Sequence, residues 1–167
     1  MMGKKPDENI RLPMQWSSGP NAGFSTARPW RSPAGDFAVV NVDAQTAKPD
    51  SLLEHYRALI QLRNRYSALQ TGELIMLKSN KPSVYTAVRA DKDGIFLILT
   101  NLSNQAIDDY NIPLDQAGLA GSAYRVSAVF GAEQVDAPEV TQDRLQKFKP
   151  FAALPPYAMI VLKFDPK

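Results

Sequence analysis

The spacing of apolar residues changes along this chain from a helical period to a strand period. Over residues 51–65, SLLEHYRALIQLRNR, apolar side chains recur every three to four positions, and Leu52 and Tyr56 lie on one stripe. Ser51 and Glu54 form the Ser-x-x-Glu pattern of a capping box, in which each side chain accepts from the backbone amide of the other. The pattern therefore predicts a helix that begins at Ser51.

From Gly72 onward the apolar positions alternate with a period of two, which is typical of strands. Turn residues separate segments rich in β-branched, aromatic and aliphatic side chains, namely 74–78, 83–90, 94–101, 107–112, 124–130, 145–149 and 159–164. We expect Asp91 to Gly94 to close a hairpin, with Gly94 at a positive φ. About seven or eight short antiparallel strands favour a mainly β domain, a Greek-key β-sandwich over residues 68–167.

Residues 1–47 are rich in turns, and only 37–42 has the composition of a short strand. Within them, residues 11–30 (RLPMQWSSGPNAGFSTARPW) contain three prolines, which exclude regular secondary structure. Both tryptophans of the protein, Trp16 and Trp30, lie in this segment. Because disordered segments are poor in aromatic residues, we interpret it as a packed loop beside a site, with its glycine at 23 in a positive-φ conformation.

Composition and charge exclude several classes of protein. The 167 residues are 44% hydrophobic, and 19 basic residues are interspersed with 17 acidic ones, so no single-sign field favours nucleic acid or an anionic membrane. Cysteine is absent, which excludes disulfides and thiolate chemistry. No apolar run resembles a signal sequence or a membrane span. We expect a cytoplasmic protein without a nucleic-acid or membrane partner, although many exported bacterial proteins also lack cysteine.

The titratable residues do not form a recognisable catalytic constellation. His55 is the only histidine, and a triad or a metal site would need partners at a defined spacing. Asp7, Asp91, Asp93 and Asp108 stand in polar or turn-rich contexts, where aspartate favours local hydrogen bonds. We therefore expect no catalytic residue, no metal ligand and no cofactor in this chain.

The order of residues in the first 72 positions resembles a known enzyme family. The blocks that carry the resemblance are RLPMQW at 11–16, NAGFS at 21–25, Pro29-Trp30, GKKPDE at 3–8, Asn41-Val42 with Gln45, and the helix from Ser51 to Arg63. They look like the segment after the eighth barrel strand in the α-amylase superfamily, glycoside hydrolase family 13, closest to its oligo-1,6-glucosidase and α-glucosidase branch. Leu12, where threonine or valine is more usual, and residues 31–38 depart from the family pattern.

The resemblance implies a division of the chain and an activity for a longer parent. Residues 1–67 would be the last loop and last helix of an incomplete (β/α)8 barrel, and 68–167 would be the C-terminal domain. The parent would hydrolyse or transglycosylate α-glucosidic bonds by a double displacement, which needs two carboxyl groups about 5 to 5.5 Å apart. In the family these carboxylates follow earlier barrel strands, and their motifs do not occur here. We therefore expect the 167-residue chain to be inactive alone.

The same resemblance assigns two substrate-binding candidates. In the family, the arginine of the RLPMQW-like motif reaches the terminal glucose at the cleavage subsite. The resemblance gives that role to Arg11, whose planar guanidinium can donate paired hydrogen bonds to hydroxyl groups. Trp16 is the second candidate, because an indole ring can stack on a sugar, although tryptophans in proline-rich loops more often anchor the loop.

Two other classes of function remain as alternatives. The β domain could be a carbohydrate-binding module with an aromatic platform, or an interaction domain that only caps the barrel. Its aromatic residues are tyrosine and phenylalanine without tryptophan, and several occupy core-facing positions. The expected partners are an α-glucosidic oligosaccharide and the catalytic barrel of the parent, together with self-association of the isolated chain through its apolar helix.

Overall fold

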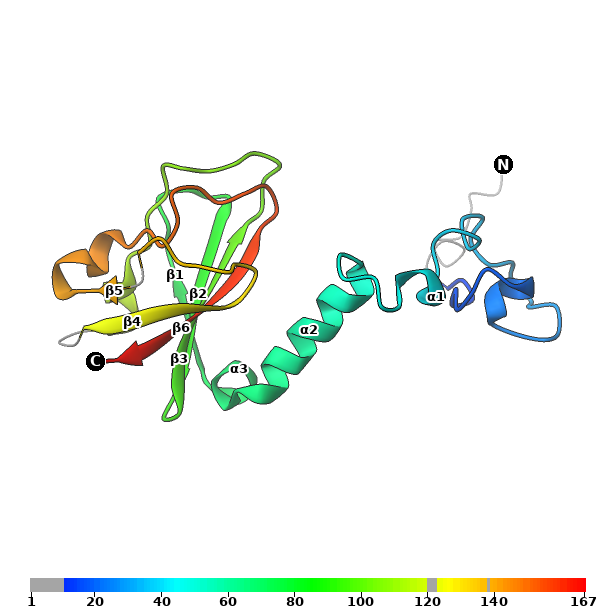
Figure 1. The fold of residues 1–167 in the computed structure, drawn as a ribbon, viewed down its shortest axis with the longest axis horizontal. Helices are drawn as coiled ribbons and strands as arrows, with labels where there is room; N and C mark the ends of the chain where they lie inside the picture. Colours follow the sequence, from blue (N-terminus) through cyan, green and yellow to red (C-terminus); the bar gives the residue numbers. More distant parts are fainter. Residues whose placement is uncertain (1–10, 120–122, 138) are drawn as a thin grey trace, which may run out of the picture. The chain divides into compact units, whose positions relative to one another are not determined.

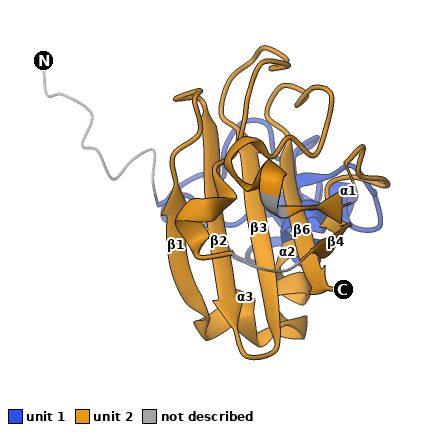
Figure 2. Ribbon diagram, turned by 90° about the vertical axis from the view of Figure 1, so that its left-hand side faces the viewer, with its two compact units in different colours: residues 1–58 blue, residues 59–167 orange. Residues whose placement is uncertain are grey.

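The computed structural model describes residues 11–119, 123–137 and 139–167. The GKKPDE block, with Asp7 and Glu8, lies outside these residues. The chain divides into two compact units, residues 1–58 and 59–167 (Figure 2). The boundary expected between residues 67 and 68 from the family resemblance stays a prediction. None of the helices in the described ranges is long and apolar enough to cross a membrane.

The first unit is built from turns and short helical segments. A 3-10 turn at Pro20–Gly23 precedes helix α1, Val42–Gln45 (Figure 1). The strand predicted over 37–42 is wrong, because the amides of Val39 and Val40 both donate to the carbonyl of Asp36, at 2.9 and 2.8 Å, and close a turn. Asn41 then accepts from the amide of Ala44 at 2.8 Å and caps α1.

Helix α2, Leu52–Arg65, is the long helix that the apolar period predicted. Ser51 Oγ accepts from the amide of Glu54 at 3.3 Å, as expected for the start of a helix. The second hydrogen bond predicted for the capping box, from the amide of Ser51 to the side chain of Glu54, is wrong. The carboxylate of Glu54 accepts from the amide of Ala47 at 3.2 Å, while the amide of Ser51 donates to the carbonyl of Lys48 at 2.9 Å. The loop before the helix therefore uses Glu54 to satisfy its own backbone.

The second unit contains one antiparallel sheet with the strand order β1-β2-β3-β6-β4-β5 (Figures 1 and 2). The strands are β1 Glu73–Leu77, β2 Val84–Asp91, β3 Gly94–Asn101, β4 Tyr124–Phe130, β5 Glu139–Val140 and β6 Met159–Pro166. The predicted hairpin between β2 and β3 is confirmed by the pairing of Asp91 with Gly94. Gly94 is not among the described glycines with positive φ, so that expectation is wrong. A Cβ at Gly94 would lie 2.9 Å from the ring of Phe96, and this close approach favours glycine.

Alternate side chains of the sheet pack against different layers. Leu97, Leu99 and Leu162 point into the main core, which the segments around Ile112 and Phe148 cover from outside. Those segments pair through two isolated bridges, Ile107 with Leu154 and Ile112 with Phe148. On the other face, Phe96 and Val161 pack against Ala68 and Leu69 of the short helix α3, Ser67–Thr71.

The predicted mainly β, antiparallel class is therefore confirmed, with two packed layers. The prediction of continuous strands over residues 107–112 and 145–149 is wrong. The first range contributes two single bridge residues, and residues 145–147 lie in a 3-10 segment, Gln142–Lys147. The second layer is an irregular cover rather than a second regular ladder, because its apolar side chains fill the core without continuous backbone pairing.

Candidate functional site

The proline-rich segment 11–30 has a defined backbone conformation. The amides of Trp16 and Ser17 both donate to the carbonyl of Ala22, at 2.9 and 3.0 Å, and close a tight loop. Asn21, Ala22 and Gly23 adopt φ angles of 53°, 57° and 67°, so the chain turns through three consecutive left-handed residues. The positive φ predicted for Gly23 is confirmed, and a Cβ there would lie 2.6 Å from Ser17 Oγ.

Gln15 connects this loop to the residues that precede α1. Its side-chain nitrogen donates to Asp36 Oδ1 at 3.0 Å and to the carbonyl of Val40 at 2.8 Å. Its own carbonyl accepts from the amide of Val42 at 2.9 Å. These three hydrogen bonds hold the backbone next to Trp16 in one position, which suits residues that must present side chains to a ligand.

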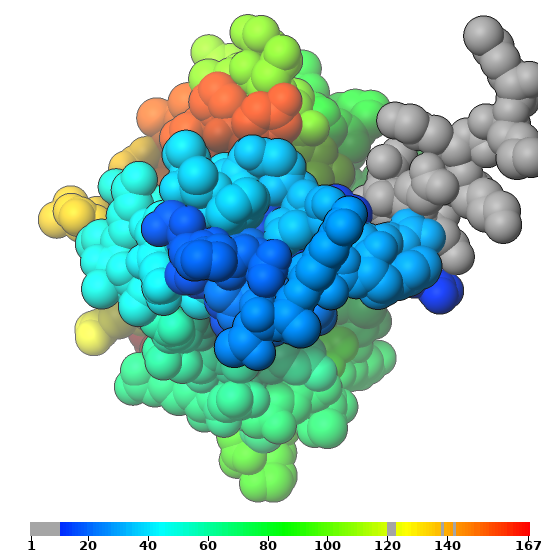
Figure 3. Space-filling view, turned by 90° about the vertical axis from the view of Figure 1, so that its right-hand side faces the viewer, coloured from blue at the N-terminus to red at the C-terminus, as the bar shows by residue number. Residues whose placement is uncertain are grey.

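The two residues singled out from the sequence, Arg11 and Trp16, both lie exposed within the first unit, and Trp16 is 50% exposed. Figure 3 shows the surface of this part of the chain in blue. A shallow depression of about 360 Å3 lies beside it, lined by Leu12, Trp30, Arg31 and Ser32. The guanidinium of Arg31 lies 4.5 Å from the centre of the Trp30 ring, within range of a cation–π contact. The sequence interpretation missed Arg31, although its position directly after Trp30 was a usable signal.

Two of the described carboxylates, Asp91 and Asp109, have pKa values shifted in the direction opposite to the one that a general acid needs. A hydrogen bond from Ser67 lowers the pKa of Asp91, and a hydrogen bond from Lys81 lowers the pKa of Asp109. A lowered pKa keeps these groups ionised at neutral pH, whereas a general acid must hold its proton. The described residues contain no cluster of three or more His, Cys, Asp or Glu side chains that could hold a metal ion.

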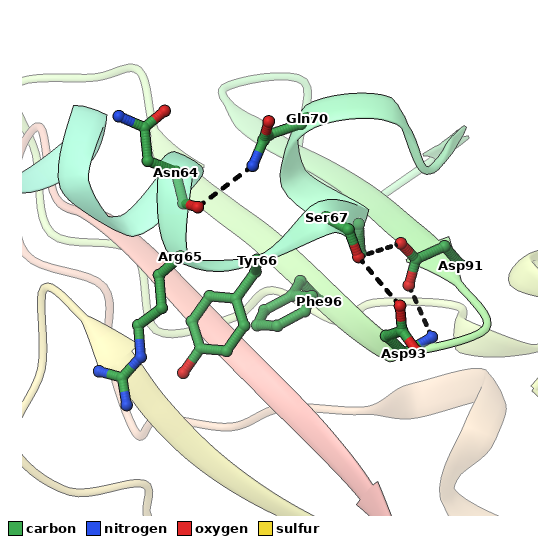
Figure 4. Close-up of a pocket in the computed structure, with 9 residues that line it drawn as sticks. Asn64, Arg65, Tyr66, Ser67, Gln70, Asp91, Asp93 and Phe96 are labelled. Carbon is green, nitrogen blue, oxygen red and sulfur yellow. Dashed lines mark hydrogen bonds between the residues drawn. The ribbon is translucent and has the colours of Figure 1, made fainter.

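A second cavity, here called the Tyr66 pocket, lies wholly within the second unit and was not anticipated from the sequence. Its volume is about 370 Å3, and its lining residues come from the end of α2, from α3 and from the β2–β3 hairpin (Figure 4). The ring of Tyr66 packs on Phe96 with the centroids 4.6 Å apart. Asp91 and Asp93, which the sequence indicated only as turn residues, face Ser67 across this pocket.

Comparisons with known proteins identify similar sequences and folds. Residues 1–72 match the family model described as "Alpha amylase, catalytic domain". Over 101 residues the chain is 38% identical to a glucan 1,6-alpha-glucosidase of Streptococcus pneumoniae serotype 4, covering 60% of this chain and 19% of that protein. It is 35% identical over 101 residues to a probable oligo-1,6-glucosidase 2 of Bacillus subtilis, and this match covers 60% of this chain and 18% of that protein. The chain thus spans about a fifth of the length of the curated relatives it matches.

A solved structure covers nearly the whole chain. The trehalose-6-phosphate hydrolase of Bacillus licheniformis superposes with a TM-score of 0.68 at 24% identity, over 96% of this chain and 26% of that one. At this identity the superposition shows the fold.

Residues 1–72 of the chain match the α-amylase superfamily, glycoside hydrolase family 13, and the chain is similar to enzymes of its oligo-1,6-glucosidase branch. The family recognised from the blocks around Arg11 is thereby confirmed.

Proposed function

We propose that this chain is the C-terminal part of a retaining glycosidase that acts on α-glucosides, and that it contributes substrate contacts but no catalytic carboxylate. The observation that carries this proposal is the match of residues 1–72, which include the RLPMQW block, to a catalytic-domain model. Curated relatives that share this region are named as 1,6-glucosidases. Hydrolysis requires a nucleophile and an acid that other parts of such an enzyme would supply.

Within this enzyme, Arg11 is the proposed contact to the substrate. Its guanidinium is exposed, planar and always charged, so it can donate two parallel hydrogen bonds to sugar hydroxyls or orient a neighbouring carboxylate. The backbone a few residues further on is held by the hydrogen bonds of Gln15, which limits the positions that Arg11 can reach. Trp16 is proposed as a second contact, because half of its side-chain surface is accessible to a sugar ring.

We propose the catalytic barrel of the parent enzyme as the partner of the apolar surfaces that this chain exposes. Large hydrophobic side chains are exposed on α2 and on the outer face of β1 and β2, namely Leu52, Tyr56, Ile60, Leu74, Met76 and Tyr85. Exposed apolar patches of this kind mark interfaces. Most of the described aromatic side chains of the β domain are buried, which favours this capping role over a carbohydrate-binding platform.

The cytoplasmic location expected from the sequence also stays a proposal. Fractionation of the source cells, followed by detection with an antibody raised against residues 59–167, tests it. Recovery of the protein in the medium or in a membrane fraction would contradict it.

A chimera tests the enzymatic proposal. The C-terminal segment of the pneumococcal glucan 1,6-alpha-glucosidase that matches this chain is replaced by this chain, and turnover of a chromogenic α-glucoside is measured for the chimera and for the 167-residue chain. We expect turnover by the chimera and none by the chain. Replacing Arg11→Ala in the chimera should lower kcat/KM by roughly 100-fold, because a misplaced sugar reacts slowly. Arg11→Lys should retain part of the activity, since lysine keeps the positive charge but lacks the planar guanidinium that donates two parallel hydrogen bonds.

The control for the chimera is Arg144→Ala, which removes an exposed arginine of the second unit and should leave kcat/KM unchanged. Two results would overturn the proposal. One is full activity of the Arg11→Ala chimera. The other is turnover by the 167-residue chain alone that disappears when one of its own carboxylates is replaced.

A further inference from the structure

The Tyr66 pocket has walls that several hydrogen bonds fix in place. The carbonyls of Ala68 and Gln70, in α3, accept hydrogen bonds from Arg89, at 3.2 and 3.0 Å. Arg63 donates to the carbonyl of Leu69 at 2.7 Å. Two arginines from α2 and β2 therefore hold the C-terminal end of α3, and the pocket beside it is largely preformed. A volume of about 370 Å3 lies in the range of roughly 300–1,000 Å3 that is usual for small-molecule sites.

The pocket combines an aromatic wall with hydrogen-bonding groups. Tyr66 is half-buried against Phe96, and the guanidinium of Arg65 lies 5.4 Å from the centre of its ring. On the helical side of the pocket, Figure 4 shows Ser67 directed towards the hairpin and Gln70 directed towards the backbone carbonyl of Asn64, to which it donates at 3.2 Å. Such a mixture of a ring, hydroxyl groups, amides and a guanidinium provides both donors and acceptors.

The acceptor groups of the hairpin retain capacity for a ligand. Ser67 Oγ lies 2.5 Å from Asp91 Oδ2 and 3.4 Å from Asp93 Oδ2, but a hydroxyl has one proton and can donate to only one of them at a time. Asp91 Oδ1 is used by the turn, where it accepts from the amides of Asp93 and Gly94 at 2.8 and 3.1 Å. Asp91 Oδ2, which accepts from Ser67, and Asp93 Oδ2, which accepts from Lys92 at 2.9 Å, each retain a second lone pair for a ligand hydroxyl.

The formal charges of the residues that line the pocket balance when Lys92, which pairs with Asp93, is included. Asp91 and Asp93 are countered by Arg65 and by Lys92, whose Nζ lies 2.9 Å from both carboxylate oxygens of Asp93. A site with no net charge has no electrostatic preference for a phosphate or for an ammonium ion. A ligand with many hydroxyl groups satisfies both the acceptors and the donors without adding charge.

We infer that the Tyr66 pocket binds a neutral saccharide unit, with Tyr66, Ser67, Asp91 and Asp93 contacting its hydroxyl groups. This site is formed by the second unit alone, so it is separate from the proposed substrate contact at Arg11 and does not depend on it. Its consequence is that the C-terminal domain would hold part of a glucan chain without cleaving it.

The test uses the 167-residue chain labelled with 15N and titrated with maltose or isomaltose. We expect saturable shifts of the amide signals of residues 64–70 and 91–96. The double variant Tyr66→Phe with Asp93→Asn keeps the ring on Phe96 and the shape of the turn, and it should weaken binding at least tenfold. Its matched control is Tyr85→Phe with Asp108→Asn, which makes the same chemical changes at exposed positions that do not line the pocket and should leave the affinity unchanged.

Three results would overturn the inference. The first is the absence of saturable shifts in these two ranges with either disaccharide, while the spectrum shows a folded chain. The second is equal affinity of the pocket variant and the wild type. The third is tighter binding of inorganic phosphate or ethylammonium than of the disaccharides at the same residues, which would indicate an ionic ligand. Because this readout does not involve catalysis, its failure leaves the proposed function of the chain untouched.

Discussion

The hydroxyl of Tyr110 donates a hydrogen bond to the carbonyl of Phe151 at 3.0 Å and accepts one from the amide of the same residue at 3.1 Å. Both residues are buried, and they belong to the irregular layer that covers the inner face of the sheet. A side chain that satisfies both polar groups of one distant peptide fixes the register of that layer without a strand ladder. This contact therefore replaces the regular pairing that the second layer lacks.

Tyr110→Phe should destabilise the second unit by roughly 1–3 kcal/mol. The phenylalanine fills the same space but leaves a buried amide and a buried carbonyl of Phe151 without their partner, and such groups are expensive to leave unsatisfied. Urea unfolding followed by circular dichroism measures the difference. Tyr85→Phe, at an exposed position of β2, is the control and should change the free energy of unfolding by less than about 0.5 kcal/mol.

The stability of this unit should fall in alkali because of the same residue. Burial raises the pKa of Tyr110 from its ordinary value of 10.0 to about 12. The folded state therefore keeps the phenolic proton at a pH where the unfolded chain releases it, so the stabilisation is complete below pH 10 and is lost as the pH rises towards about 12. The free energy of unfolding is measured for the wild type and for Tyr110→Phe between pH 10 and about 12. The difference between the two pH profiles gives the contribution of the Tyr110 hydroxyl to stability. Parallel pH profiles for the two proteins would contradict it.

Gly131→Ala should be far more damaging than Gly118→Ala. Both glycines have positive φ, 78° and 68°, so both substitutions carry the left-handed backbone cost of about 1–2 kcal/mol. A Cβ at Gly131 would also lie 2.0 Å from the carbonyl oxygen of Met159, whereas nothing lies within 4 Å at Gly118. The clash would push β4 away from β6, and we expect a total loss of roughly 3 kcal/mol or more. Equal unfolding midpoints for the two variants would show that the backbone relaxes.

The isolated chain should self-associate through α2. Leu52, Tyr56 and Ile60 are spaced four residues apart, share one face of the helix and are 65%, 59% and 56% exposed. Apolar groups arranged in this way bury one another when two copies meet. Light scattering over a range of concentrations should show dimers, and Ile60→Lys should shift the equilibrium to monomer. Gln61→Lys adds the same charge on a neighbouring face and should have little effect. A wild-type chain that stays monomeric at high concentration would refute this prediction.

Local patterns were sufficient for the features whose physics is local. The start of α2 followed from Ser51 and Glu54, because a capping hydrogen bond joins residues three positions apart. The β2–β3 hairpin followed from its turn residues, and the alternation in β3 and β6 followed from the two differently packed faces of one sheet. The family was recognisable from the blocks around Arg11 because a loop that must hold a particular backbone path tolerates few sequences.

Tertiary packing decided the features that join residues distant in sequence. The apolar residues of 107–112 and 145–149 have strand composition, yet they form single bridges, because the core is filled by side chains such as Ile112 and Phe148 without a ladder. Composition alone cannot distinguish these outcomes. The Tyr66 pocket depends on Ser67 meeting Asp91 across 24 residues, a contact that exists only when α3 packs on the sheet beside the hairpin. The sequence by itself therefore determined the helix, the strand period and the family, whereas the three-dimensional packing decided which polar side chains share a cavity.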